Sequence, residues 1–164
     1  MRYTREGRAV TYIHYGDTAF SPVKFTPAKN DGTWVKPTGG LWASPDEDSE
    51  NSWKYWCECN DFRECSEDNA FRFNMRDPSR IFFIDSKKAY TEFISRYVTR
   101  GDNPFRFDDS FMTSWDRIDF EKMMADGYDG MEISLSSYPE LYNLLYCWDV
   151  DSIVVFNRDA VVPC

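Results

Sequence analysis

Residues 9–15 read AVTYIHY, and a glycine and an aspartate follow them. β-Branched and aromatic side chains are enriched in strands, and a glycine beside an aspartate is typical of a turn. The segment therefore predicts a first β-strand that ends at Gly16. It carries His14, which is the only histidine of the chain. Residues 18–40 then hold three prolines, an Asn-Asp-Gly run and a glycine pair, which predict a long irregular connection.

A helix is expected directly after this connection. Ser44 and Pro45 precede three acidic residues, a pattern typical of a helix start. Serine caps the free N–H groups, proline suits the first position, and carboxylates face the positive end of the helix dipole. Trp53, Trp56 and Cys57 then recur at helical spacing, so their side chains are expected on one face of that helix.

Strand and helix patterns follow one another along the rest of the chain. Strands are expected where apolar residues alternate with polar ones or form short runs, at residues 71–75, 81–84, 131–135 and 153–156. Helical segments are expected at residues 86–98, 119–125 and 139–147. Ser86 caps the first of these, and Gly101 and Gly127 are expected to stop the first two. Because no repeat or linker divides the 164 residues, we expect one domain over residues 1–164.

Composition argues against several classes of partner and location. Acidic residues exceed basic ones by 28 to 19, and a net charge of -9 disfavours contact with a phosphate backbone. No apolar run approaches the roughly 18 residues that a membrane span requires, and the first residues lack the apolar stretch of a secretion signal. Five cysteines cannot all pair within one chain, which favours a reducing compartment. We therefore expect a cytoplasmic protein with no membrane segment and no nucleic-acid partner.

Cys57, Cys59 and Cys65 have side chains of a type that binds zinc, and they would supply three of the four ligands that zinc takes. Their spacing misses the usual gap of about two to four residues between paired ligands, and the only histidine lies far upstream. We expect no metal.

Four short motifs follow one another in a characteristic order: IHYG at residues 13–16, GGLWAS at 39–44, a tryptophan at 53, and DSIVVF at 151–156. Together they resemble the ADP-ribosyltransferase family, in the branch that includes the poly-ADP-ribose polymerases and diphtheria toxin. In that branch a strand histidine is followed closely by glycine, and a glycine-rich strand with an aromatic residue comes next. A second aromatic residue arrives eleven residues later on a helix, and Trp42 and Trp53 have this spacing.

The resemblance implies a fold and a cofactor. The fold is α+β, with two small, mostly antiparallel sheets packed around a cleft and with flanking helices. The cofactor is NAD, and the residues implied to bind it are His14, Tyr15, Gly16, Gly40, Trp42, Ser44 and Trp53. In this arrangement His14 bonds a ribose hydroxyl and Trp53 stacks on nicotinamide. Glycine lets the backbone beside His14 approach the nicotinamide amide closely.

Two acidic residues compete for the catalytic role that the resemblance implies. Asp151 opens the DSIVVF motif, at the place where the family carries a glutamate. Glu132 follows the sequence GYDGM, which is similar to the preceding strand in small toxins of the family. The glycosidic bond of NAD breaks through an oxocarbenium-like state, whose charge a nearby carboxylate stabilises. Glu132 or Asp151 is therefore expected to be catalytic.

For each candidate residue an ordinary structural role is the alternative to a role in NAD binding or catalysis. His14 suits a half-buried histidine held by one backbone hydrogen bond, and Gly40 suits a turn. Trp53 suits core packing, because aromatic residues dominate protein interiors. Glu132 suits a solvated strand face, and Asp151 suits turn chemistry ahead of a strand.

The expected function is ADP-ribosyl transfer from NAD to a protein acceptor, by a toxin-type or phage-type effector that acts on host machinery. A catalytically inactive member of the fold, which inhibits a basic partner by binding it, is the alternative. Tryptophan in place of the family's tyrosine, and aspartate in place of its glutamate, favour that alternative. A related RNA phosphotransferase is disfavoured because it needs arginine-rich phosphate contacts and this chain is acidic.

Overall fold

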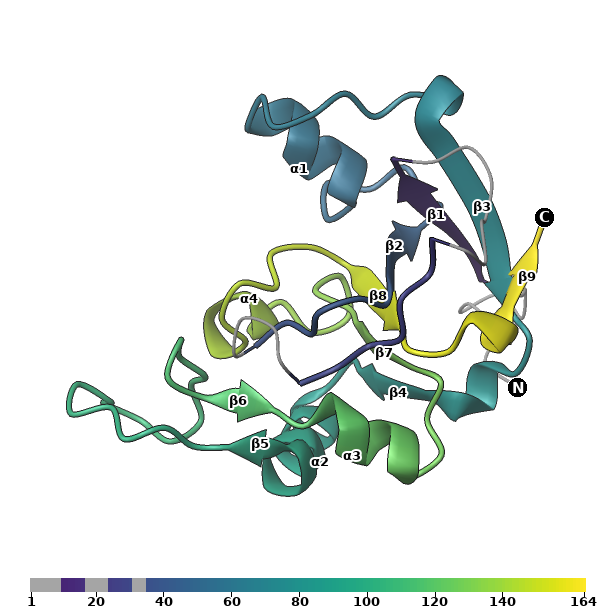
Figure 1. Ribbon diagram of the computed structural model, residues 1–164. Helices are drawn as coiled ribbons and strands as arrows, with labels where there is room; N and C mark the ends of the chain where they lie inside the picture. The colour runs from purple at the N-terminus through teal and green to yellow at the C-terminus, as the bar shows by residue number, and fades with distance from the viewer. Residues whose placement is uncertain (1–9, 17–23, 31–34) are drawn as a thin grey trace.

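The computed structural model describes residues 10–16, 24–30 and 35–164. They form a mixed α+β structure with a seven-stranded sheet, a two-stranded sheet and four α-helices in this part of the chain (Figure 1). The strands are β1 (Thr11–Tyr15), β2 (Leu41–Pro45), β3 (Ala70–Met75), β4 (Ile81–Ile84), β5 (Val98–Thr99), β6 (Arg117–Ile118), β7 (Gly130–Ile133), β8 (Ser152–Val155) and β9 (Val161–Pro163). The α-helices are α1 (Trp53–Cys59), α2 (Lys87–Tyr97), α3 (Phe120–Ala125) and α4 (Leu141–Leu144). Within the described residues, no helix is long and apolar enough to cross a bilayer.

The large sheet has the strand order β4-β7-β8-β2-β1-β3-β9. Only β4 and β7 pair in parallel, and every other pair in this sheet is antiparallel. β2 changes partner along its length, because residues 41–43 pair with β8 whereas Ser44 and Pro45 pair with β1. The family resemblance implied two small sheets around a cleft, whereas the structure has one seven-stranded sheet that is continuous through β2, and a separate sheet formed by β5 and β6.

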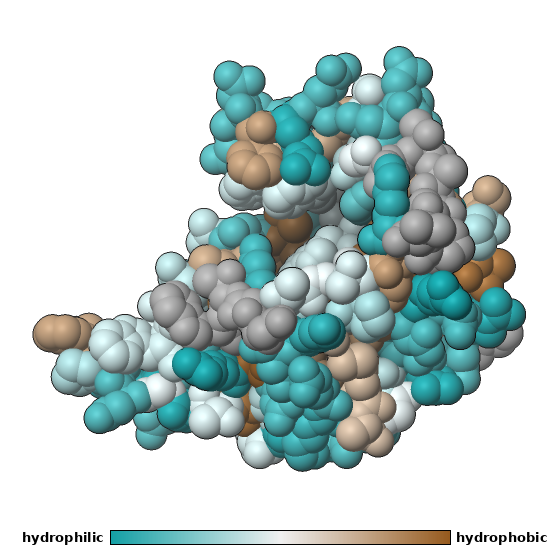
Figure 2. All heavy atoms as spheres, in the orientation of Figure 1, coloured by the Kyte–Doolittle hydropathy of each residue, from teal (hydrophilic) through white to brown (hydrophobic). Residues whose placement is uncertain are grey.

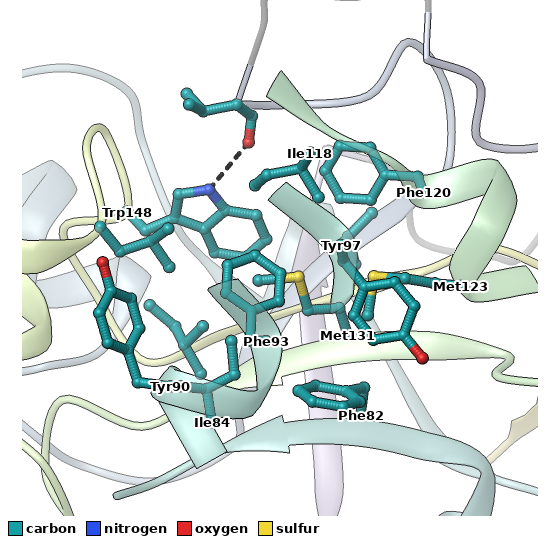
Figure 3. Packing of buried hydrophobic residues seen from close by; sticks show 14 of the residues in the cluster. Phe82, Ile84, Tyr90, Phe93, Tyr97, Ile118, Phe120, Met123, Met131 and Trp148 are labelled. Carbon is teal, nitrogen blue, oxygen red and sulfur yellow. Dashed lines mark hydrogen bonds between the residues drawn. The ribbon is translucent and has the colours of Figure 1, made fainter. Parts of the chain in front are cut away.

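Buried side chains pack on both faces of this sheet. One cluster joins β4, β7 and β8 to α2 and α3, and Figure 3 shows Phe82, Phe93 and Met131 within it. Trp148 belongs to the same cluster, and its indole N–H donates to the carbonyl oxygen of Val35 at 3.0 Å (Figure 3). A second cluster packs β1 and β3 against the opposite face of β8. β8 is buried on both faces, which explains why residues 153–156 read as a continuous apolar run.

Several local predictions are confirmed. The strands expected at residues 71–75 and 81–84 are β3 and β4, and β3 alternates buried and half-buried residues as its sequence predicted. The Ser86 side chain caps α2 by accepting from the N–H of Ala89. α3 ends before Gly127, whose φ of 95° lies in the left-handed region.

The helix start predicted at Ser44 is wrong. Ser44 and Pro45 lie in β2, where they pair with β1, and α1 begins at Trp53. Its cap is Ser52, whose hydroxyl accepts from the N–H of Tyr55 at 3.2 Å. The sequence around Ser44 has real capping chemistry, but pairing with β1 overrides a local preference of this kind.

The expected stop of α2 at Gly101 is also wrong, because α2 ends at Tyr97 and the chain continues as β5. Glycine is needed at position 101 for a different reason. A Cβ atom there would overlap the carbonyl oxygen of Trp115, so the two backbone segments approach closely at this point.

Asp116 holds the base of the β5–β6 connection together. It is fully buried and accepts hydrogen bonds from Arg100 at 3.1 Å, from Arg106 at 2.5 Å, and from the N–H groups of Gly101 and Thr113. Burial by itself raises the pKa of Asp116, but the hydrogen bonds from Arg106, Thr113 and Gly101 outweigh it. The pKa of this carboxyl is therefore below its usual value.

Replacing this carboxylate gives a pH-dependent loss of stability. Asp116→Asn is expected to lower the free energy of unfolding at pH 7 by about 3 kcal/mol, because it leaves two arginines without their buried partner. A lowered folded-state pKa means that the carboxylate stabilises the fold fully above the unfolded-state pKa of about 3.9. That contribution is lost as the pH falls through the folded-state pKa, so the difference between the two proteins shrinks in acid.

Urea unfolding at pH 7 and at successively lower pH measures this effect. Asp102→Asn is the matched control, because Asp102 is exposed on the same connection, and it is expected to change stability by less than about 0.5 kcal/mol. A loss in Asp116→Asn that is the same at every pH contradicts the account.

Candidate functional site

His14 is held by one hydrogen bond to the neighbouring strand. Its Nδ1 lies 2.7 Å from the carbonyl oxygen of Trp42. Because a carbonyl oxygen only accepts, Nδ1 carries the proton, and in the neutral ring Nε2 is left as an acceptor. Nε2 lies toward Gly16, 3.3 Å from where a Cβ atom at that position would be. The half-buried ring can therefore accept from a hydroxyl group beside Gly16.

The backbone after His14 is partly committed within the protein. The N–H of Gly16 donates to the carbonyl oxygen of Asn69 at 2.8 Å. The carbonyl oxygen of Tyr15 accepts from the guanidinium of Arg63 at 3.4 Å. A nicotinamide contact through the N–H of Gly16 would therefore have to break the bond to Asn69. The same geometry brings the cationic Arg63 beside His14 and Gly16.

Gly40 and Trp42 have structural roles. Gly40 has a φ of 76°, and its N–H donates to the carbonyl oxygen of Thr26 at 2.7 Å, so the glycine serves a turn. Trp42 packs against Trp148, with ring centroids 4.9 Å apart, and Lys36 lies over the Trp42 ring. Trp42 is thus a partly buried residue packed against the main hydrophobic core, and it lies opposite the buried Val154 in the sheet.

Helix α1 presents a stacked pair of indoles. The rings of Trp53 and Trp56 are 5.0 Å apart and nearly parallel, with an interplanar angle of 9°. Phe62 packs its edge against both rings, and Arg63 lies over the Phe62 ring. Both tryptophans are half-buried, so the prediction of one shared face is confirmed and this face still reaches solvent. The hydroxyl of Ser44 accepts from the N–H of Trp53 at 3.3 Å and fixes the start of α1 on β2.

Asp151 is buried at the start of β8, where three hydrogen bonds hold it. Its Oδ1 accepts from the N–H groups of Leu135 and Ser136, and its Oδ2 accepts from the Ser136 hydroxyl at 2.5 Å. A carboxylate offers about four acceptor positions, so one remains for a further donor. Asp151 also donates its own N–H to the carbonyl oxygen of Asn51, just before α1.

Glu132 lies elsewhere, and the solvated strand face that was one explanation for it is wrong. The residue is 6% exposed and accepts from the hydroxyl of Tyr12 at 2.8 Å. It pairs with Ile153 and Phe83 in the neighbouring strands, on the face opposite to that of Met131. Glu132 is therefore part of the interior between β1 and β7, whereas Asp151 is bonded to residues that reach the surface.

Two residues that the sequence did not single out connect these parts. The side-chain amide of Asn51 donates to the hydroxyl of Ser136 at 3.0 Å, and Ser136 in turn donates to Asp151. This network ties the start of α1 to the β7–α4 turn and to β8. Figure 2 shows the surface hollowed between the α1 segment and the region of α4. Asn51 and Ser136 stand in turn-like serine-rich and asparagine-rich sequence, which carries no sign of a site.

A separate cavity of about 330 Å³ lies on the β1–β3 side of α1, and Tyr15 and Ser44 line it. Its charged lining residues are mainly acidic, with five carboxylates against Lys54 and Arg72, and Arg72 is already paired with Asp46 at 2.7 Å and Glu67 at 2.6 Å. These carboxylates repel a pyrophosphate group. The cavity therefore does not suit NAD, and Arg63 is the cation placed beside His14.

No metal centre is found among the described residues, which contain no group of three or more His, Cys, Asp or Glu side chains able to hold an ion.

The chain matches no family model, no curated protein and no solved structure. The arrangement of side chains is therefore the basis for a functional conclusion.

Removal of the Asp151 carboxylate is expected to destabilise the fold. Asp151→Ala leaves the buried N–H of Leu135 without its acceptor, which costs about 1–3 kcal/mol. Asp151→Asn keeps one acceptor oxygen and should cost less. Urea unfolding compares both with Asp149→Ala, an exposed control two residues away, expected to stay within about 0.5 kcal/mol of the wild type. Equal stabilities for Asp151→Ala and Asp149→Ala argue against this role.

Proposed function

We propose that the chain is an ADP-ribosyltransferase-like enzyme that binds NAD in the hollow beside α1 and transfers ADP-ribose to a protein acceptor. One observation carries the proposal. His14, Arg63, the Trp53–Trp56 stack and Asp151 come from four separate segments that meet around the start of α1 through intervening residues. Arg63 donates to the carbonyl oxygen of Tyr15, next to His14, and lies over the Phe62 ring that packs against the indole stack. Asp151 donates its N–H to the carbonyl oxygen of Asn51, just before the helix. On this proposal the seven-stranded sheet with its change of partner at β2 is a variant of the family's fold.

Each group has a chemical part in this proposal. On this proposal the half-buried indole of Trp53 takes the nicotinamide ring, because aromatic rings stack favourably on such surfaces. Nε2 of His14 accepts from a ribose hydroxyl, and the guanidinium of Arg63 pairs with the pyrophosphate. On this proposal the remaining acceptor position of Asp151 serves the nicotinamide ribose, where positive charge develops.

The reaction follows from these positions. The bond between the ribose C1′ and the nicotinamide nitrogen breaks, and nicotinamide leaves as a neutral molecule with the bonding electron pair. The carboxylate of Asp151 stabilises the oxocarbenium-like state. An acceptor nucleophile then forms a bond to C1′ and releases its proton to water. Glu132 has no part in these steps, because its carboxylate lies in the interior beside Tyr12.

A protein on the same fold that inhibits a partner without catalysis is the second candidate. It is favoured by the commitment of Asp151 to three internal hydrogen bonds and of the Gly16 N–H to Asn69. Such a protein needs neither NAD nor a free acceptor position at Asp151. The two candidates therefore predict opposite results when NAD is added.

The release of nicotinamide from NAD tests the enzymatic activity. Reactions are run with and without host lysate, and the released nicotinamide is measured by chromatography. Asp151→Asn is expected to lower the rate by about a hundredfold or more, as the loss of one charge-stabilising group does in other enzymes. Glu132→Gln is expected to keep a rate within about tenfold of the wild type. Asp149→Asn is the control for an exposed aspartate in the same segment.

Thermal unfolding in the presence of NAD measures binding, because a ligand that binds the folded state raises the free energy of unfolding by RT ln(1 + [L]/Kd). The wild type is expected to gain stability, and Trp53→Ala is expected to lose that gain. No nicotinamide release and no NAD-dependent shift would sink the enzyme and favour the inhibitory protein. Release abolished by Glu132→Gln but kept by Asp151→Asn would reverse the assignment of the acid.

A further inference from the structure

Residues 100–116 connect β5 to β6, and we call them the aromatic loop. They project from the body of the molecule (Figure 1), and the projection has an apolar tip in Figure 2. Four large side chains of the loop are exposed: Phe105 at 77%, Phe107 at 101%, Phe111 at 41% and Trp115 at 55%. Single exposed apolar residues are ordinary, but several on one projecting segment are typical of an interaction surface.

The aromatic loop is held in shape by buried contacts at its base. Asp116, at one end of the segment, bonds Arg100 at the other end and Arg106 within it. Met112 is buried in the main core, and its N–H donates to the carbonyl oxygen of Leu144 at 2.7 Å. The hydroxyl of Tyr90 donates to the carbonyl oxygen of Ser110. A loop ordered before binding loses less conformational entropy on binding, so the exposed rings are presented in a form suited to a partner.

The charge of the aromatic loop limits the kind of partner. Arg100 and Arg106 are both paired with Asp116, while Asp102, Asp108 and Asp109 are exposed. The rings therefore share the loop with three exposed aspartates, on a chain whose net charge is -9. Nucleic acids and anionic membranes are repelled by such a surface. A protein surface with basic residues around an apolar patch is complementary to it.

We propose that the aromatic loop is the docking surface for a basic protein, with Phe105 and Phe107 as its main anchors. Identifying this protein as the acceptor rests on the proposed function. The bond from Met112 to Leu144 ties the loop to α4, and α4 follows the turn in which Ser136 holds Asp151. A protein docked on the loop is thus brought to the same side of the molecule as the hollow beside α1.

A defined peptide tests the docking surface without any reference to catalysis. Fluorescence anisotropy is measured with labelled synthetic peptides of alternating leucine and lysine, leucine and glutamate, or serine and lysine. The Leu–Lys peptide is expected to bind the wild type at least about tenfold more tightly than the other two, because it alone matches both charge and apolar character. The double variant Phe105→Ser/Phe107→Ser is expected to lose about tenfold or more of that affinity.

The double variant is expected to fold, because both rings are largely exposed, and its melting temperature checks this. Val162→Ser is the matched control, since Val162 is an exposed apolar residue on β9. Unchanged Leu–Lys binding in the double variant overturns the proposal, as does equal binding of the Leu–Glu peptide. If the Leu–Lys peptide does not bind, and the protein instead binds neutral phosphatidylcholine vesicles or associates with itself, the proposal is overturned as well.

Labelling with NAD that carries its label on the adenosine separates this proposal from the proposed function. In host lysate the double variant is expected to label protein about tenfold less than the wild type, while nicotinamide release without lysate is unchanged. Equal labelling by the two proteins contradicts docking of the acceptor on the loop. No nicotinamide release from either protein contradicts the proposed function alone, and the peptide experiment still decides whether the loop docks a basic protein.

Discussion

Backbone pairing along β2 is the constraint on which the candidate site depends. Residues 41–43 bond to β8 and the next two residues bond to β1, so this short strand joins the two halves of the sheet. The same strand supplies the carbonyl oxygen that fixes His14 and the hydroxyl that fixes the start of α1. β2 therefore connects His14 to the indole stack, through the carbonyl oxygen of Trp42 and the hydroxyl of Ser44.

Much of the secondary structure follows from local sequence. β3, β4, α2 and α3 carry clear periodicity or caps, and each forms close to where its sequence predicts. The exceptions arise where distant segments compete with local signals. Ser44 has the chemistry of a helix cap, but its backbone pairs with β1 instead. Gly101 is required by the close approach of Trp115. Contacts of this kind join residues that are far apart in the sequence, so they produce no periodic pattern from which they could be predicted.

The candidate site was predictable in its parts but not in its connections. The sequence singled out His14, Trp53 and Asp151, and the fold brings them around the start of α1. It gave no reason to choose Arg63, Asn51 or Ser136, whose importance comes from their neighbours in space. The choice between the two acids also needed the fold, because alternation turns Glu132 to one face of the sheet while Asp151 lies just before the next strand, β8.

The central claim is that NAD binds against the indole stack of α1, and indole N–H signals in a two-dimensional NMR titration test it directly. The chain has six tryptophans, and single substitutions assign their signals. The account predicts that NAD shifts the Trp53 and Trp56 signals and leaves those of Trp115 on the aromatic loop and the buried Trp148 unchanged. NAD-dependent shifts confined to Trp115 or Trp148, or no shift at any indole, would contradict it.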